Sequence, residues 1–390
     1  MEFEFTEEQS IVQREVRKFI ESELTEEDRQ HGDSQMTPEL AKDLLKRLIP
    51  WGYVGPDQPT DPIIEGILFE EMGRVFPSLA GLAFIANGAA RYVAQGAHPD
   101  VKTRLAEDLL MCERIGCMGI SEPNVGSDPT GVECRAELKG DRYIINGNKI
   151  WISNGHIADV AIVICQTDKS KGPLGFQAIL VDRKETPFES RDIETVGLAA
   201  FPNSELSFND LEVPAINRLG GWDTNNQESL LLKKKESTKG NPFNFNSARV
   251  MCASISCGIA SKALEEAIEY AKVRKQFGKE IGRFQLVQAL LADMAMDLEA
   301  ARLLTFRARQ KMSRGHADKE VSIAKAFATE MGVRVTNKAM EVMGALGLTR
   351  EAGMEKRMRD ARMWVVPDGT SQIQRLIIGK ELTGFTATRG

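Results

Sequence analysis

Apolar residues recur with helical spacing at both ends of the chain. Near the start, Thr6 followed by Gln9 predicts a capping box that opens an amphipathic helix, and Thr37 before Pro38 predicts the beginning of another. Beyond about residue 245, apolar residues at every fourth position predict a long helix with one buried face: Leu286, Leu290, Met294 and Leu298. We therefore expect helices over residues 1 to about 115 and again from about 245 onward.

Between these parts, from about residue 116 to 220, the pattern changes to short apolar stretches that are typical of strands. Asn146-Gly147 separates two such stretches, 143–145 and 150–152, and predicts a two-residue hairpin turn. Further strands are predicted over residues 158–166, 175–182 and 204–208. The order of helices, strands and helices predicts an α+β fold with three domains, at residues 1–115, 116–225 and 226–390.

Composition and charge narrow the classes of function. The 390 residues carry a net charge of −6 with scattered basic residues, so nucleic acid is not an expected partner. The longest uncharged stretch, Val75–Ala90, is too short to span a membrane, and the acidic N-terminus carries no export signal. The six cysteines include no Cys-x-x-Cys pair, and the four histidines are not spaced for metal binding. We expect a cytoplasmic protein with reduced thiols, no metal centre and no membrane partner.

Four short motifs carry most of the functional information: residues 119–128 (GISEPNVGSD), 149–155 (KIWISNG), 274–278 (RKQFG) and 359–375, which ends in DGTSQIQR. In this order and spacing they resemble the signatures of the acyl-CoA dehydrogenase flavoproteins, over nearly the whole chain. The resemblance implies an N-terminal helical domain, a central β-barrel domain and a C-terminal four-helix bundle. It also implies that FAD takes a hydride from the β-carbon of an acyl thioester while a carboxylate removes the α-proton, leaving the trans-2-enoyl thioester.

The resemblance further assigns residues to the FAD site. Trp151 is expected to cover the isoalloxazine ring, and Ser153 to offer its hydroxyl to N5. Other expected contacts along the flavin and the adenosine part are Ser121, Ser127, Ile152, Thr370 and Gln372. A neighbouring subunit is expected to contribute Arg274, Gln276, Phe277, Phe284, Gln285, Glu341, Gly344 and Ala345. Such a shared site implies a homodimer or homotetramer, of which we expect the tetramer.

Two of these matches are imperfect. Glu341 stands where the family often has Gln, and its carboxylate would repel a pyrophosphate unless an Arg or Lys pairs with it. Ala345 stands where a Gly is usual. Both departures weaken the expected contact from the second subunit.

The substrate side is expected, by resemblance, to include Ser127, Phe245, Asn246, Arg249 and Gly369. The usual catalytic segment Tyr-Glu-Gly-Thr is replaced here by Pro-Asp-Gly-Thr, residues 367–370. Asp is one C–C bond shorter than Glu, about 1.5 Å of lost reach, so Asp368 needs a shifted backbone or substrate to act as the base. Pro367, which fixes its own φ, is a plausible source of that shift.

A second position for the base exists in part of the family, and Ala248 fills it here. Ala cannot take a proton. Two hypotheses follow: either Asp368 is the base, or the natural protein has Glu at position 248 and this chain is an inactive version.

Coenzyme A is the expected thioester carrier. An alternative is an acyl or prolyl group held on a carrier protein, to which the basic cluster Lys233–Lys239 could dock. The expected electron acceptor is another flavoprotein or oxygen. An alternative of another class is a protein that binds flavin or thioester without catalysis.

Overall fold

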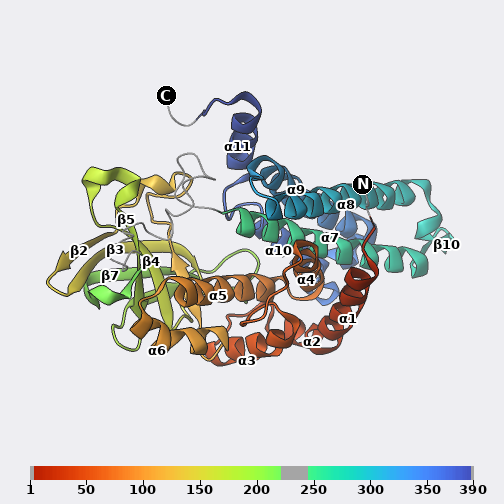
Figure 1. The fold of residues 1–390 in the computed structure, drawn as a ribbon. Helices are drawn as coiled ribbons and strands as arrows, with labels where there is room; N and C mark the ends of the chain where they lie inside the picture. Colours follow the sequence, from red (N-terminus) through yellow and green to blue (C-terminus); the bar gives the residue numbers. More distant parts are fainter. Residues whose placement is uncertain (1–3, 221–244, 388–390) are drawn as a thin grey trace.

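The computed structural model describes residues 4–220 and 245–387, which follow the expected order of helices, sheet and helices (Figure 1). The helices of the N-terminal part are α1 (Glu7–Glu23), α2 (Thr25–His31), α3 (Pro38–Leu48), α4 (Pro62–Val75), α5 (Pro77–Gly96) and α6 (Pro99–Leu110). The capping box of α1 is confirmed, because Thr6 Oγ1 accepts from Gln9 N over 3.3 Å and Gln9 Oε1 accepts from Thr6 N over 3.0 Å. Thr37 caps α3 as predicted, with Pro38 in its first turn.

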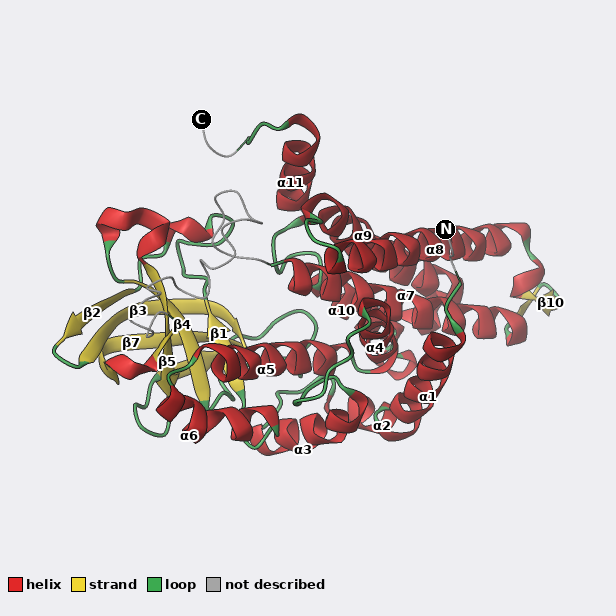
Figure 2. Ribbon diagram, in the orientation of Figure 1, coloured by secondary structure: helices red, strands yellow, loops and turns green. Residues whose placement is uncertain are grey.

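The central part is one mixed sheet, gathered at one end of the molecule in Figure 2. Its strands are β1 (Gly116–Gly119), β2 (Arg135–Lys139), β3 (Arg142–Ser153), β4 (Val160–Gln166), β5 (Phe176–Asp182), β6 (Glu189–Asp192), β7 (Asn203–Pro214) and β8 (Arg218–Leu219). They lie in the order β6-β7-β3-β2-β4-β5-β8, and β1 pairs with β4 in parallel. Apolar residues of α5 and α6 pack against β4 and β5, which attaches the N-terminal helices to the sheet.

The predicted hairpin turn at Asn146-Gly147 is wrong. Strand β3 runs through it without a break, and the chain reverses instead at Gly140, between β2 and β3. Gly147 has a φ of 144°, and the register with β7 shifts between Ile145 and Gly147, so the dipeptide forms a bulge inside a long strand. A Cβ at Gly147 would lie 2.8 Å from the Cα of Cys134, so close packing also requires a glycine here.

The C-terminal part consists of long helices. They are α7 (Asn246–Val273), α8 (Gln285–Ser313), α9 (Asp318–Met343), α10 (Met354–Met363) and α11 (Ser371–Thr383), with the small hairpin β9 (Lys275–Gln276) and β10 (Lys279–Glu280) between α7 and α8. The apolar stripe predicted for α8 is buried at Met294 and Leu298, but Leu286 is 82% exposed. The prediction fails at Leu286 because the first turn of α8 lies at the outer end of the bundle, beside the hairpin (Figure 1).

Helices α4 and α7 cross with their backbones in contact. A Cβ at Gly258 would lie 2.0 Å from the carbonyl oxygen of Glu70, and one at Gly73 would lie 2.5 Å from that of Ile255. Only glycine fits at these two positions without a shift of the backbone. The crossing therefore sets the distance between the N-terminal and C-terminal helices.

The cysteines, the helices and one polar cluster bear on the sequence expectations about thiols, membranes and metals. All six cysteines lie in the described part of the chain, and each is buried and free. Within residues 4–220 and 245–387, no helix combines the length and apolar character needed to cross a bilayer. The fold places His316 Nε2 2.7 Å from Glu381 Oε2 and close to Asp318, a cluster that sequence spacing missed because Glu381 is distant in the chain.

Candidate active site

The end of strand β3 carries the residues expected to face the flavin. Trp151 has a left-handed backbone, with a φ of 62°, and its side chain is 57% exposed, which is unusual for a large aromatic residue on a strand. Ile152 beside it is buried, and Ser153 is half-buried. The pairing of β3 with β7 is irregular between Lys149 and Ile152, so Trp151 departs from the regular alternation of the strand. The result is an exposed indole on a hydrogen-bonded strand, a surface that a flat ring can cover.

The loop after β1 lies beside this strand. Ile150 N donates to Ser121 O over 3.0 Å, and Ser127 is exposed farther along the loop. Beneath the loop, Lys149 Nζ lies 2.6 Å from Glu122 Oε1, and both side chains are buried. This ion pair joins the loop to the strand that carries Trp151.

Residues 197–202 connect the end of β3 to the other domains. The main-chain N–H of Asn154 donates to Pro202 O over 2.8 Å, and its side chain donates to Leu82 O of α5 over 3.1 Å. Phe201 stacks on Trp364, with ring centroids 6.2 Å apart. Because Trp364 is four residues before Asp368, this packing joins the strand end to the segment that carries the predicted acid.

Asp368 lies in a tight turn between α10 and α11. Asp368 and Gly369 have φ values of 57° and 97°, and Asp tolerates this left-handed region better than most residues. Three buried side chains hold the carbonyl oxygens of the turn. Arg249 Nε donates to Asp368 O over 3.0 Å, Lys325 Nζ donates to Gly369 O over 2.9 Å, and Gln374 Nε2 donates to both oxygens over 3.1 and 2.8 Å. Side chains from three helices, α7, α9 and α11, therefore fix the conformation of the turn.

The electrostatics of this turn favour a reactive carboxyl group. Burial raises the pKa of Asp368, while the charges of Lys325 and Arg249 and a hydrogen bond from Cys252 act in the opposite direction. The Sγ of Cys252 lies 3.5 Å from Asp368 Oδ2. Burial also lowers the pKa of Lys325 and raises that of the Cys252 thiol. A carboxylate with a raised pKa is a better proton acceptor, which is what a general base requires.

Four of the five residues expected on the substrate side come together at the start of α7, whereas Ser127 lies in the loop after β1. Arg249 Nη1 donates to Asn246 Oδ1 over 3.3 Å, and its guanidinium lies 5.7 Å from the centre of the Phe245 ring. Arg249 also reaches Asp368 O, which brings Gly369 into the same group. Ala248 is on the same helical turn, half-buried, and offers only a methyl group.

The second group of expected FAD contacts lies elsewhere. Arg274 and Gln276 are exposed at the β9–β10 hairpin, Gln285 is exposed at the start of α8, and Phe284 is half-buried. Phe277 is 94% exposed, with a φ of 53°. In Figure 1 this hairpin and the sheet are at opposite ends of the molecule. One chain therefore does not bring the hairpin residues together with Trp151 and Ser153 at the end of β3.

The remaining expected contacts are at helix ends. Thr370 caps α11, where its Oγ1 accepts from Ile373 N over 3.4 Å, and Gln372 is exposed in the first turn. Three residues are exposed at the end of α9: Glu341, Gly344 and Ala345. The described side-chain partner of Glu341 is Asn337, over 3.3 Å, and not an Arg or Lys.

Comparisons with known proteins decide the family. Profiles of the N-terminal, middle and C-terminal domains of acyl-CoA dehydrogenases match residues 6–113, 117–211 and 243–383. The cyclohex-1-ene-1-carbonyl-CoA dehydrogenase of Geobacter metallireducens is 34% identical, over 97% of this chain and 98% of that protein. The chain belongs to the acyl-CoA dehydrogenase family.

Two further proteins resemble this acyl-CoA dehydrogenase family member over almost its whole length. Subunit CarC of the caffeyl-CoA reductase–Etf complex of Acetobacterium woodii is 32% identical, over 96% of this chain and 98% of that protein. A solved structure described as PigA with FAD and proline aligns with a TM-score of 0.85 at 26% identity, covering 98% of this chain and 99% of that one.

Membership confirms the expected fold, FAD dependence and enzyme class, an oxidoreductase that acts on the CH–CH bond of an acyl thioester. The residues present fit FAD. Strand β3 and the loop that pairs with it carry an exposed indole and two half-buried serines, Ser121 and Ser153, and Arg274 offers a planar fork suited to a pyrophosphate.

Three residues of this acyl-CoA dehydrogenase site were missed by sequence reasoning: Cys252, Lys325 and Gln374. Gln374 falls inside the DGTSQIQR motif, so its position there was a usable signal. Lys325 interrupts the apolar run SIAKAFA, residues 322–328, which is a weaker signal of a buried charge. Nothing in the sequence singles out Cys252.

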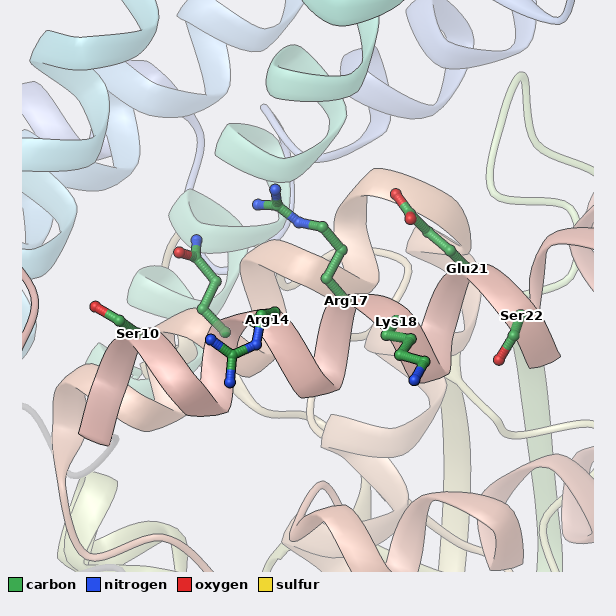
Figure 3. A pocket seen from close by; sticks show the side chains of 7 residues that line it. Ser10, Arg14, Arg17, Lys18, Glu21 and Ser22 are labelled. Carbon is green, nitrogen blue, oxygen red and sulfur yellow. The ribbon is translucent and has the colours of Figure 1, made fainter. Parts of the chain in front are cut away.

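A surface groove of about 410 Å³ lies on α1 and is separate from this site (Figure 3). All of its lining residues belong to α1. Arg17, one of them, turns away to pair with Glu71 over 2.7 Å. None of the predicted site residues lines the groove.

Proposed function

We propose that this enzyme oxidises the Cα–Cβ bond of a CoA acyl thioester, with Asp368 as the base that takes the α-proton. The observation that carries the proposal is the turn that presents the half-buried Asp368 beside three buried side chains, Arg249, Lys325 and Cys252. Proton uptake makes the carboxyl group neutral, which is the form that burial favours. When bound, FAD supplies the hydride acceptor.

The shorter reach of Asp is met by the backbone. The left-handed conformation of Asp368, held by donors from three helices, defines where its carboxylate begins, and the contact with Cys252 Sγ limits its direction. A substrate that lies closer to α7 would then bring its α-carbon within reach of Oδ. Ala248 offers no competing acid on the first turn of α7.

The experiment follows flavin bleaching when the FAD-loaded enzyme is mixed with acyl-CoA thioesters in the absence of oxygen. Asp368→Asn is expected to retain FAD and to reduce it about 10²- to 10⁴-fold more slowly, because only the proton acceptor is lost. Ala248→Glu is the matched variant, which offers an acid at the other family position.

Wild-type speed in Asp368→Asn would contradict the assignment of the base. Bleaching that occurs only after Ala248→Glu would support the second hypothesis, in which the natural base is at position 248. A yellow protein that no thioester bleaches would indicate binding without catalysis.

We propose coenzyme A, and not a carrier protein, as the thioester carrier. The names of the Geobacter and Acetobacterium relatives refer to CoA thioesters, which supports this choice. The basic cluster Lys233–Lys239, which suggested docking of an acidic carrier, lies outside the described residues. Matched acyl and prolyl thioesters on CoA and on a carrier protein provide the test. Faster bleaching by the carrier-bound form would overturn the proposal.

We propose an electron-transferring flavoprotein as the acceptor. The relative named as part of an Etf complex supports it, and oxygen is the alternative. Mixing the substrate-reduced enzyme with either acceptor compares them directly. Reoxidation by oxygen at the rate found with the flavoprotein would contradict the proposal.

We propose a homo-oligomer, with the tetramer as its expected form, in which the β9–β10 hairpin of one chain completes the FAD site of another. The exposure of Phe277 supports this arrangement, as does the position of the hairpin at the opposite end of the molecule from the sheet in Figure 1. Co-expressed chains carrying Trp151→Ala and Arg274→Ala should recover part of the FAD-dependent reduction that each variant lacks alone. No recovery would contradict a FAD site that is shared between chains.

A further inference from the structure

Lys325 is a buried cation whose hydrogen bonds end on main-chain oxygens. Its side chain is fully buried on α9, and Nζ donates to Val365 O over 2.7 Å and to Gly369 O over 2.9 Å. In the described part of the chain, no carboxylate oxygen lies within 4.0 Å of this nitrogen. A buried ammonium group without a carboxylate is expensive to maintain, so its position calls for an explanation other than stability.

The two carbonyl groups that Lys325 holds lie on either side of Asp368 in the sequence. Val365 precedes the turn and Gly369 follows the acid, so a single ammonium group ties together both ends of the turn. Arg249 and Gln374 hold the carbonyl of Asp368 between them. Lys325 therefore helps to fix the backbone from which the Asp368 carboxylate projects.

The charges around Asp368 do not cancel. Arg249 and Cys252 face it from α7, Lys325 from α9 and the neutral amide of Gln374 from α11. Asp318 and Glu330 act on the two cations from farther away: Asp318 on Arg249, and Glu330 on Lys325. The immediate surroundings of the carboxylate thus hold two positive charges against its one negative charge.

We propose that Lys325 is a positioning residue for Asp368, which fixes both ends of the 366–369 turn and favours the ionised form of the acid. The inference rests on the proposed role of Asp368 as the base. It explains how a half-buried carboxyl group is kept ready to accept a proton at neutral pH. The residue acts through Asp368 and touches neither substrate nor flavin.

The test separates the charge of Lys325 from its hydrogen bonds. Lys325→Gln keeps hydrogen-bond donors without the charge, and Lys325→Arg keeps the charge. The protonation of Asp368 is followed by infrared spectroscopy of the FAD-loaded enzyme over a range of pH, as the difference between each protein and the same protein carrying Asp368→Asn. The pH profile of thioester-dependent flavin reduction is measured in parallel.

We expect the infrared midpoint to rise by about one pH unit or more in Lys325→Gln and to stay in place in Lys325→Arg. The acid limb of flavin reduction should move with it. Lys338→Met is the matched control, because Lys338 is on the same helix but pairs with Asp293 over 2.9 Å. The Lys338→Met variant should shift neither the infrared midpoint nor the acid limb of flavin reduction.

The outcomes are distinct. An unchanged midpoint in Lys325→Gln, with only a lower rate, would reduce Lys325 to a structural role and overturn the inference. A shifted midpoint together with wild-type flavin reduction in Asp368→Asn would refute the assignment of the base and leave the positioning of Asp368 intact. If Lys325→Gln does not fold, the position of the midpoint in Lys325→Arg decides, because movement there would contradict a role of the charge.

Discussion

Lys149 and Lys325 are both fully buried, but their charges are met in different ways. Lys149 Nζ lies 2.6 Å from the carboxylate of Glu122 and 3.0 Å from Ile120 O, beneath the loop that is expected along the flavin. Among the residues that the structure describes, Lys325 donates only to main-chain oxygens, beside Asp368. The flavin side of the site therefore contains a neutral ion pair, whereas the acid side keeps a buried positive charge next to Asp368 without a carboxylate in direct contact.

The largest loss of stability is expected when the paired lysine, Lys149, is replaced. Lys149→Met leaves Glu122 buried without a cation and should lower the free energy of unfolding by about 3–5 kcal/mol. Urea denaturation measures the loss. Lys139→Met is the control, because Lys139 is exposed on the neighbouring strand β2 and pairs weakly with Glu137 over 3.4 Å. Adding Glu122→Gln to Lys149→Met should recover part of the loss, and no recovery would show that the pair is not coupled.

Lys325→Met should destabilise the protein less, by about 1–3 kcal/mol. Val365 O loses its buried donor, but Gly369 O keeps Gln374, and no carboxylate loses an ion-pair partner. The same urea titration compares the two lysines directly. A loss of stability equal to that of Lys149→Met would show that the two buried lysines do not differ in how their charges are met.

The pH dependence of the wild-type enzyme tests the environment of Asp368. The raised pKa of Asp368 places the acid limb of flavin reduction above about 3.9, the ordinary value for Asp. Since the base must be unprotonated, the rate should fall about tenfold for each pH unit below that pKa. Rapid mixing across a pH series measures it. A limb at or below the ordinary value would show that burial does not control this group.

The smallest effect is expected from the neutral donor of the turn. Gln374→Met removes two hydrogen bonds to the carbonyls of Asp368 and Gly369 but no charge, so stability should fall by about 1 kcal/mol. The acid limb should stay where it is in the wild type. Movement of the limb would mean that hydrogen bonding, and not charge, sets the protonation of Asp368.

The parts of the molecule that were predictable are those specified by local sequence. The caps at Thr6 and Thr37 and the order of helices and strands depend on neighbouring residues, and the structure confirms them. Asn146-Gly147 was misread because a turn and a bulge both need a glycine with positive φ. Only the pairing with β7 distinguishes them.

The environment of the acid could not be predicted in the same way. Cys252 lies 116 positions before Asp368, and Lys325 lies 44 before Gly369, so their contacts depend on how α7 and α9 pack. A buried lysine that binds carbonyls has no sequence signature, because its partners are main-chain atoms that every residue carries. The roles of the expected flavin and substrate residues stay predictions for the experiments above.

The contact between α4 and α7 at Gly73 and Gly258 has a consequence for how this enzyme can acquire new substrates. Two backbones that already touch cannot move closer, and they can separate only by losing a direct main-chain contact. Changes of substrate preference that keep this crossing intact therefore come from exchanging individual side chains around it. Mutant libraries that seek a different chain-length preference should leave both glycines unchanged.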